Sequence, residues 1–329
     1  MKLGIVGTGK IVKEFLPELV KLPGLQVEAL CSTPRSAAAA GELCALYGIP
    51  RQFTDYEAML PEVDAVYIAV PNHLHRVHTL AALRAGKHVI VEKPMAVCEA
   101  DAREMAEEAR ARGLFLFEAV TTQYLENYAC IRELLPRVGT VKLVQCCYSQ
   151  YSSRYDAFCA GEILPAFDPA CAGGALMDLN FYNVSYIVGL FGEPKKVSYS
   201  ANIERGIDTS GVLTMDYNGF KAVAIGAKDC AAPARLVIQG TKGYILQKTP
   251  PNVCGPVTFH ANDGTEEHFS RNGKRPRMVS EFEVFVRTID EGDMDRYSGL
   301  LDTSLAVSRV LTAARRSAGI VFPSDRRGR

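Results

Sequence analysis

The sequence predicts an α/β protein with two domains. The first is a doubly wound parallel sheet of the Rossmann type, and the second is an α+β domain built on a large, mainly antiparallel open sheet. Strand and helix patterns alternate through residues 1–120, and β-rich segments dominate from residue 121 onward. A length of 329 residues also fits two domains of roughly 150 residues each. We therefore place the domain boundaries at 1–120 and 121–329.

The amino-terminal elements follow from apolar runs separated by amphipathic stretches. The runs are apolar on both faces, which is typical of parallel strands covered by helices on each side. Strands are predicted at 3–6, 27–31, 65–70, 88–91 and 114–117. Helices are predicted at 11–20, 76–85 and 99–112.

The second half follows a different pattern. Strands rich in β-forming residues are predicted at 141–151, 196–203, 211–217, 220–227 and 235–239, and Asn218-Gly219 predicts a hairpin turn. Two helices are expected at 278–290 and 299–318, and the second is a candidate for packing back on the first domain. The arginine-rich tail 325–329 is expected to be frayed.

Composition excludes several classes of protein. Lys plus Arg number 37 and Asp plus Glu number 37, so the net charge does not favour nucleic acid or an anionic membrane as a partner. No stretch approaches the roughly 18 apolar residues of a membrane span. The ten cysteines are scattered and form no C-x-x-C pair, which predicts reduced thiols, a cytoplasmic protein and no metal site.

A glycine-rich turn follows the first predicted strand. Gly7 permits a tight turn, and Gly9 lets the backbone approach a dinucleotide pyrophosphate at the start of a helix. The third glycine position of that motif holds Val12, so the match is partial, and an ordinary strand-to-helix turn is the alternative. We assign five residues to the cofactor turn: Gly7, Thr8, Gly9, Lys10 and Ile11.

The end of the second strand indicates which dinucleotide binds. NAD usually requires a carboxylate there to accept hydrogen bonds from the ribose 2′-hydroxyl. The sequence instead provides Ser32, Thr33 and Arg35, which suit a 2′-phosphate. These residues favour NADP, with NAD as the alternative cofactor, whereas a solvated turn is the purely structural interpretation.

Four spaced motifs extend the comparison over most of the chain: Gly7-Thr8-Gly9, Ala69-Val70-Pro71-Asn72-His73-Leu74-His75, Gly86-Lys87-His88-Val89-Ile90-Val91-Glu92-Lys93-Pro94 and Gly173-Gly174-Ala175-Leu176-Met177-Asp178. Together they resemble the glucose-fructose oxidoreductase/inositol dehydrogenase/MocA (Gfo/Idh/MocA) oxidoreductases. The resemblance implies that Lys93 lies beside the nicotinamide and the reacting oxygen. It also implies that the cofactor side is lined by Pro71, Asn72, His75, Glu92 and Lys93.

The last motif continues to Tyr182, four residues after Asp178, so a helix would place both on one face. The family has His or, in a branch that resembles dimeric dihydrodiol dehydrogenases, Tyr at this position. The resemblance implies that Tyr182 is the acid or base, with Lys93 and Asp178 completing the catalytic set. A structural alternative is a buried tyrosine and an aspartate at a helix start. Asn180 replaces a common Gly and adds a side chain to the expected substrate floor.

The function implied is an NADP-dependent oxidoreductase that acts on a small sugar, polyol, diol or carbonyl compound. A non-catalytic dinucleotide-binding sensor or co-regulator of the same fold is the alternative. The resemblance further implies a homodimer through the sheet of the second domain, residues 121–329, which also binds the substrate.

Overall fold

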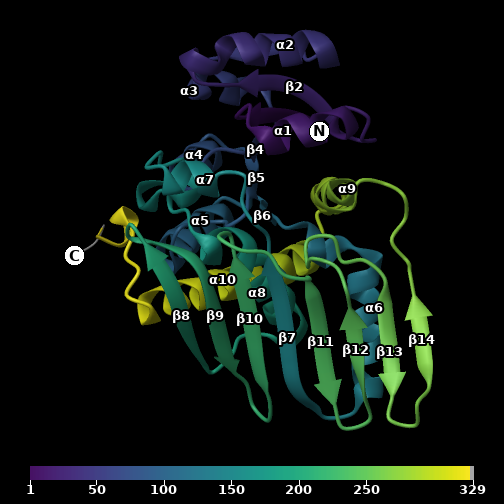
Figure 1. Ribbon diagram of the computed structural model, residues 1–329. Helices are drawn as coiled ribbons and strands as arrows, with labels where there is room; N and C mark the ends of the chain where they lie inside the picture. The colour runs from purple at the N-terminus through teal and green to yellow at the C-terminus, as the bar shows by residue number, and fades with distance from the viewer. Residues whose placement is uncertain (327–329) are drawn as a thin grey trace. The chain divides into compact units, whose positions relative to one another are not determined.

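The computed structural model describes residues 1–326, which form two compact units (Figure 1). The first unit consists of Met1–Ala119 and Arg275–Asp302, and the second of Val120–Lys274 and the residues from Thr303 onward. The chain first passes from one unit to the other between Ala119 and Val120, and residues 275–302 return to the first unit.

The first unit is built on a six-stranded parallel sheet in the order β3-β2-β1-β4-β5-β6, which is the doubly wound order predicted. Its strands are β1 (Lys2–Val6), β2 (Gln26–Cys31), β3 (Arg51–Phe53), β4 (Ala65–Ile68), β5 (His88–Glu92) and β6 (Leu116–Ala119). Its helices are α1 (Lys10–Leu19), α2 (Ala37–Tyr47), α3 (Tyr56–Met59), α4 (His75–Arg84), α5 (Glu99–Ala111) and α9 (Arg277–Glu291). The central strands β1, β4 and β5 are almost wholly buried, as their unbroken apolar runs indicate.

Helix α9 belongs to the first unit because its aromatic residues fill that unit's core. The Phe282 ring lies 4.9 Å from Phe15 and 5.1 Å from Tyr67, and the Phe285 ring lies 4.7 Å from Phe117. Such pairs contribute about 0.5–1.5 kcal/mol each beyond the burial of their area. The apolar period of α9 was visible in the sequence, but the sheet that it covers was not.

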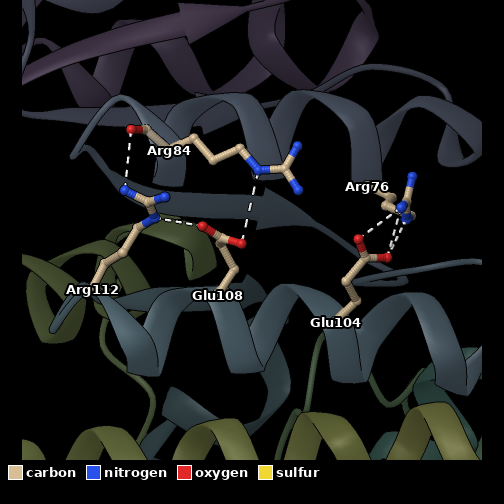
Figure 2. Close-up of polar contacts among 5 residues, drawn as sticks. All are labelled: Arg76, Arg84, Glu104, Glu108 and Arg112. Atoms are coloured by element: carbon tan, nitrogen blue, oxygen red, sulfur yellow. Dashed lines mark hydrogen bonds and ion pairs between the residues drawn. The ribbon is translucent and has the colours of Figure 1, made fainter.

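Helices α4 and α5 are joined by ion pairs (Figure 2). The Arg76 guanidinium donates to Glu104 at 2.7 and 2.8 Å, and Glu108 contacts both Arg84, at 3.8 Å, and Arg112, at 2.5 Å. Helix α4 begins directly after the loop that follows β4, so these pairs also fix the helix from which that loop extends.

The second unit contains an eight-stranded sheet in the order β14-β13-β12-β11-β7-β10-β9-β8. Only the β7·β10 pair is parallel, so the prediction of a mainly antiparallel sheet is confirmed. The strands are β7 (Val141–Ser149), β8 (Lys196–Glu204), β9 (Ile207–Asp216), β10 (Lys221–Ala227), β11 (Arg235–Gly240), β12 (Gly243–Gln247), β13 (Val257–Ala261) and β14 (Glu266–Phe269). The predicted hairpin joins β9 to β10, with Gly219 at φ +87°.

One face of this sheet is covered by helices and the other is open. Helices α6 (Glu126–Leu134) and α8 (Phe181–Phe191) lie behind the sheet in Figure 1, as does the part of α10 (Met294–Ser317) that begins at Thr303 and belongs to this unit. The short α7 (Tyr155–Cys159) follows β7. The open face exposes Leu143, Val212 and Ile225 at 44, 39 and 38%. Within residues 1–326, no helix combines the length and the apolar composition that a bilayer span requires.

Candidate functional site

A groove of about 400 Å³ in the first unit lies at the carboxyl ends of β1, β2 and β4. This is the edge at which open α/β sheets bind ligands. Predicted cofactor residues that line the groove are Gly7, Thr8, Gly9, Ser32, Thr33 and Pro71. Lining residues that sequence reasoning missed include Ser36, Thr54, Tyr56, Leu74 and His78. Tyr56 and His78 come from separate helices and meet with ring centroids 4.9 Å apart, a contact that no local motif indicates.

The two glycines of the turn have different physical requirements. Gly7 has φ +113°, and a Cβ there would lie 2.3 Å from the Ala69 carbonyl oxygen. Gly9 precedes α1 with an extended backbone, and a Cβ there would meet nothing within 4 Å. Gly7 is therefore required by the fold, whereas the space at Gly9 opens toward the groove beside free helix N–H groups. This geometry fits a dinucleotide pyrophosphate.

This difference predicts opposite results for two alanine variants. Backbone strain alone costs about 1–3 kcal/mol. Gly7→Ala is expected to destabilise the protein by more than this strain cost, because the added Cβ also clashes with the Ala69 carbonyl oxygen. Gly9→Ala is expected to keep the wild-type melting temperature and to lower NADPH affinity at least about tenfold. Thermal melts and fluorescence titration with NADPH separate the two effects. Unchanged NADPH affinity in Gly9→Ala would place the pyrophosphate elsewhere.

Other predicted cofactor residues lie beside the groove and are not part of its lining. Lys10 and Ile11 begin α1, and the exposed Lys10 pairs with Glu14 at 3.5 Å. Arg35 is exposed between the lining residues Pro34 and Ser36, and Asn72 directly follows Pro71. Lys10 and Arg35 are therefore adjacent in the chain to residues that line the groove.

His75 has a different role from the one predicted. It is fully buried, and its ring nitrogens lie 2.8 Å from the Pro94 carbonyl oxygen and 2.9 Å from that of Val70. Burial lowers the pKa of His75 to about 4, so the ring is neutral and its single N–H donates to one of these carbonyls. His75 therefore packs between the loop after β4 and the turn after β5 with one hydrogen bond to one of these carbonyls, and it is not part of the groove lining.

Glu92 and Lys93 stand at the end of β5. Glu92 accepts a hydrogen bond from the Tyr67 hydroxyl at 2.5 Å and one from the Lys93 backbone N–H at 3.3 Å. Loss of solvation raises the pKa of Glu92, while Tyr67 and Lys93 act in the opposite direction. The Glu92 carboxylate is thus occupied in holding the backbone from which Lys93 extends.

Glu281 of α9 carries a second carboxyl group, which interacts electrostatically with Glu92. Glu281 is 1% exposed, and neither of its carboxyl oxygens has a hydrogen-bond partner among the described residues. Burial, followed by the charge of Glu92, raises the pKa of Glu281 well above its usual range. These effects favour the protonated form of the Glu281 carboxyl group in the folded protein.

Protonation of Glu281 makes stability depend on pH. Above the usual carboxyl pKa of 4.5, the folded state keeps a proton that the unfolded state releases, so this group lowers stability as pH rises. Glu281→Gln removes the titration, and its stability relative to the wild type is expected to rise with pH above that value, by at most about 1.4 kcal/mol per pH unit. Denaturant unfolding from pH 5 to 8 measures this slope. The matched control is Glu291→Gln at the exposed end of the same helix, and equal slopes for both variants would contradict the prediction.

The motif Gly173–Asp178 runs into a π-helical turn, Leu176–Asn180, and this turn leads into α8. Asp178 lies in the π-turn and Tyr182 in the first turn of α8, so the backbone between them is wider than in the regular α-helix that was predicted. The turn begins at the Leu176 N–H, which donates to the buried Asp208 carboxylate at 2.6 Å. Asn180 is fully buried and donates to the Ala224 carbonyl oxygen at 3.3 Å, so its side chain binds β10 and adds nothing to a substrate floor.

Asp178 pairs with a residue that sequence reasoning missed. The Lys228 ammonium lies 2.9 Å from Asp178 Oδ2, and the two side chains are 2% and 38% exposed respectively. Tyr182 is half-buried, with its ring 6.1 Å from that of Tyr148 and 5.6 Å from that of Phe181. The structure thus places Asp178 and Tyr182 in the second unit and Lys93 in the first.

Two family models match this chain, one in each half. The family model described as "Oxidoreductase family, NAD-binding Rossmann fold" matches residues 1–120, and the "GFO/IDH/MocA C-terminal domain" matches residues 131–246. The chain belongs to the Gfo/Idh/MocA oxidoreductase family. The predicted resemblance is confirmed, and the protein is an oxidoreductase with a nicotinamide-dinucleotide-binding domain.

Two relatives cover the whole chain. The chain is 36% identical to scyllo-inositol 2-dehydrogenase (NADP(+)) IolU of Bacillus subtilis, with 99% of each protein covered. It is 28% identical to trans-1,2-dihydrobenzene-1,2-diol dehydrogenase of Mus musculus, again with 99% of each covered.

Solved structures share the fold. One is KijD10, a 3-ketoreductase from Actinomadura kijaniata in complex with NADP and TDP-benzene. It has a TM-score of 0.84 at 22% identity, with 96% of this chain and 97% of KijD10 covered. The aldose-aldose oxidoreductase of Caulobacter crescentus has a TM-score of 0.81 at 23% identity, with 97% of each chain covered.

Proposed function

We propose that the protein is an NADP-dependent dehydrogenase or reductase of a small polyol, sugar, diol or carbonyl compound. The observation that carries the cofactor assignment is the lining of the groove at the end of β2. Ser32, Thr33 and Ser36 supply hydroxyls there, and the described lining includes no carboxylate. The nearby Asp55 accepts hydrogen bonds from Glu57 N and Ala58 N at the start of α3, so it is committed to capping that helix. A 2′-phosphate suits these hydroxyls better than a 2′-hydroxyl does.

The names of the relatives support the substrate class. One is an NADP-dependent inositol dehydrogenase and another a dihydrodiol dehydrogenase, and both names describe oxidation of a ring carbon that bears a hydroxyl group. When bound, the nicotinamide dinucleotide supplies the hydride chemistry.

The residues of the chain must manage one proton and one developing charge. We assign proton transfer at the reacting oxygen to Tyr182, and charge stabilisation at that oxygen to Lys93. A phenol exchanges protons more readily near neutral pH when a cation stabilises its ionised form, which Lys93 provides in this assignment. Asp178 orients the substrate as a fixed hydrogen-bond acceptor.

The open face of the large sheet supports a homodimer. A hollow of about 720 Å³ crosses the outer surfaces of β7 to β11 and combines apolar residues such as Val212 and Ile225 with polar ones such as Gln145 and Arg235. A partly apolar sheet face of this kind suits a symmetric, self-complementary contact. All ten cysteines are free thiols, which supports a reducing, cytoplasmic location.

The test is a cofactor-coupled absorbance screen with sugars, polyols, trans-dihydrodiols and dicarbonyls, each with NADP and with NAD in the matching oxidation state. We expect turnover of at least one substrate class and a lower KM for the NADP form. Tight NADPH binding without turnover across the whole panel would instead support the alternative, a dinucleotide-binding sensor. A preference for NAD would contradict the assignment of the β2 hydroxyls.

A further inference from the structure

The Lys228 side chain is a buried cation outside the motifs that define the family resemblance. It directly follows β10, and its side chain is 2% exposed. The Nζ atom donates to the Ala166 carbonyl oxygen at 2.8 Å, pairs with Asp178 Oδ2 at 2.9 Å and lies 4.6 Å from the centre of the Phe167 ring. Burial of an ammonium group costs several kcal/mol unless it is paired and hydrogen-bonded. Asp178 is the carboxylate that pairs with the Lys228 ammonium directly, and the buried Asp208 also interacts with that charge.

The backbone around Lys228 is held on both sides. Its N–H donates to the Thr209 carbonyl oxygen at 2.8 Å, and its own carbonyl accepts from Ser152 N at 2.9 Å. The ammonium therefore stands at a fixed point at the end of β10, and it carries a long side chain whose freedom is limited by Phe167 and Ala166.

The segment that carries Asp178 rests on the same strand. A Cβ at Gly226 would lie 2.6 Å from Asn180 Cβ, so the π-turn packs directly on the backbone of β10. The Asn183 side chain donates to the Ile225 carbonyl oxygen at 2.8 Å, and Asp208 holds the Leu176 N–H. These contacts fix the backbone of the turn, and Lys228 fixes the one charged side chain on it.

We propose that Lys228 is a positioning residue that holds Asp178 as an immobile hydrogen-bond acceptor in the substrate site. This inference rests on the proposed function and deepens it. A carboxylate bound to a buried ammonium does not serve as a proton donor, which leaves proton transfer to Tyr182. Asp178 then recognises a hydroxyl of the substrate, and Lys228 acts only through Asp178.

A double-mutant cycle tests the coupling. Lys228→Met and Asp178→Asn are each expected to lower kcat/KM about 10–100-fold, and the double variant is expected to be no worse than the poorer single variant. NADPH affinity should stay within about twofold of wild type in all three, because neither side chain belongs to the lining of the glycine-turn groove. The control is Lys221→Met at the opposite end of β10. Lys221 pairs with Asp216 of β9 at 2.8 Å, but this pair is exposed, so the variant should retain full activity.

Separate outcomes identify which proposal fails. If the wild type turns over substrate and Lys228→Met does so equally well, or if the two single effects multiply in the double variant, the positioning role is overturned. If the wild type itself turns over nothing in the panel, the proposed function falls and this inference with it. Lys228→Arg covers the case in which Lys228→Met does not fold. It keeps the buried charge but shifts the donor atoms, so we expect a folded protein with reduced kcat, and full activity would contradict the proposal.

Discussion

Replacement of Tyr182 by Phe is expected to lower kcat by about 10²–10⁴-fold, the usual contribution of a positioned proton-transfer group. Lys93→Met is expected to cause a loss of similar size, because it removes the cation assigned to the reacting oxygen. If both residues act on one oxygen, the double variant should lose much less than the product of the two single effects. Steady-state kinetics with NADP and the best substrate of the panel measure all three.

The controls separate chemistry from folding and cofactor binding. Tyr182→Phe should bind NADPH as the wild type does, since Tyr182 does not belong to the lining of the glycine-turn groove. Tyr244→Phe removes a phenol from the exposed surface of β12 and should leave kcat unchanged. Retention of full turnover by Tyr182→Phe would return this residue to the alternative of a packed aromatic next to Tyr148.

The fold was accessible from the sequence because its main elements are strongly patterned. Unbroken apolar runs gave β1, β4 and β5, and the Asn218-Gly219 dipeptide gave the β9–β10 hairpin within one or two residues. The assignment of α9 was less accessible. Its amphipathic period shows that it covers a core, but only the Phe282 and Phe285 contacts show which sheet supplies that core.

Only part of the candidate site could be predicted from the sequence, because local motifs do not record tertiary contacts. Gly7 and Gly9 are specified by a local backbone requirement that a motif can record. His75 belongs to a motif as well, yet it is fully buried between the Pro94 and Val70 carbonyls, and the motif does not distinguish a buried histidine from one that lines the groove. Lys228 had a usable signal: in a strand of period two, it continues the buried positions Ala222, Ala224 and Gly226.

The carboxyl-terminal tail shows how tertiary contacts override composition. Residues 325–329 were expected to be frayed because they are polar and terminal; 327–329 lie outside the described residues, but Pro323–Arg326 form a short 3₁₀ turn. Within it, Asp325 accepts from Arg315 Nη2 at 2.7 Å and from Phe322 N at 2.7 Å. The Arg315 side chain is 1% exposed, so the tail supplies the counter-ion of a buried guanidinium.

Asp325→Ala is therefore expected to destabilise the protein by about 3–5 kcal/mol, because it leaves the buried charge of Arg315 without its carboxylate. Although burial opposes ionisation, the hydrogen bonds from Arg315 lower the pKa of Asp325 overall, so its contribution is present above the usual value of 3.8 and is lost as pH falls below it. The gap between wild type and variant in denaturant unfolding should accordingly be full at pH 7 and narrow toward pH 3. Asp302→Ala is the matched control: it breaks a carboxylate–arginine pair of 2.8 Å whose partner, Arg110, is 49% exposed, and it should change stability by less than about 1 kcal/mol. Equal effects of the two variants would mean that the Asp325 pair behaves as a surface contact, and that the tail does not hold Arg315 in the core.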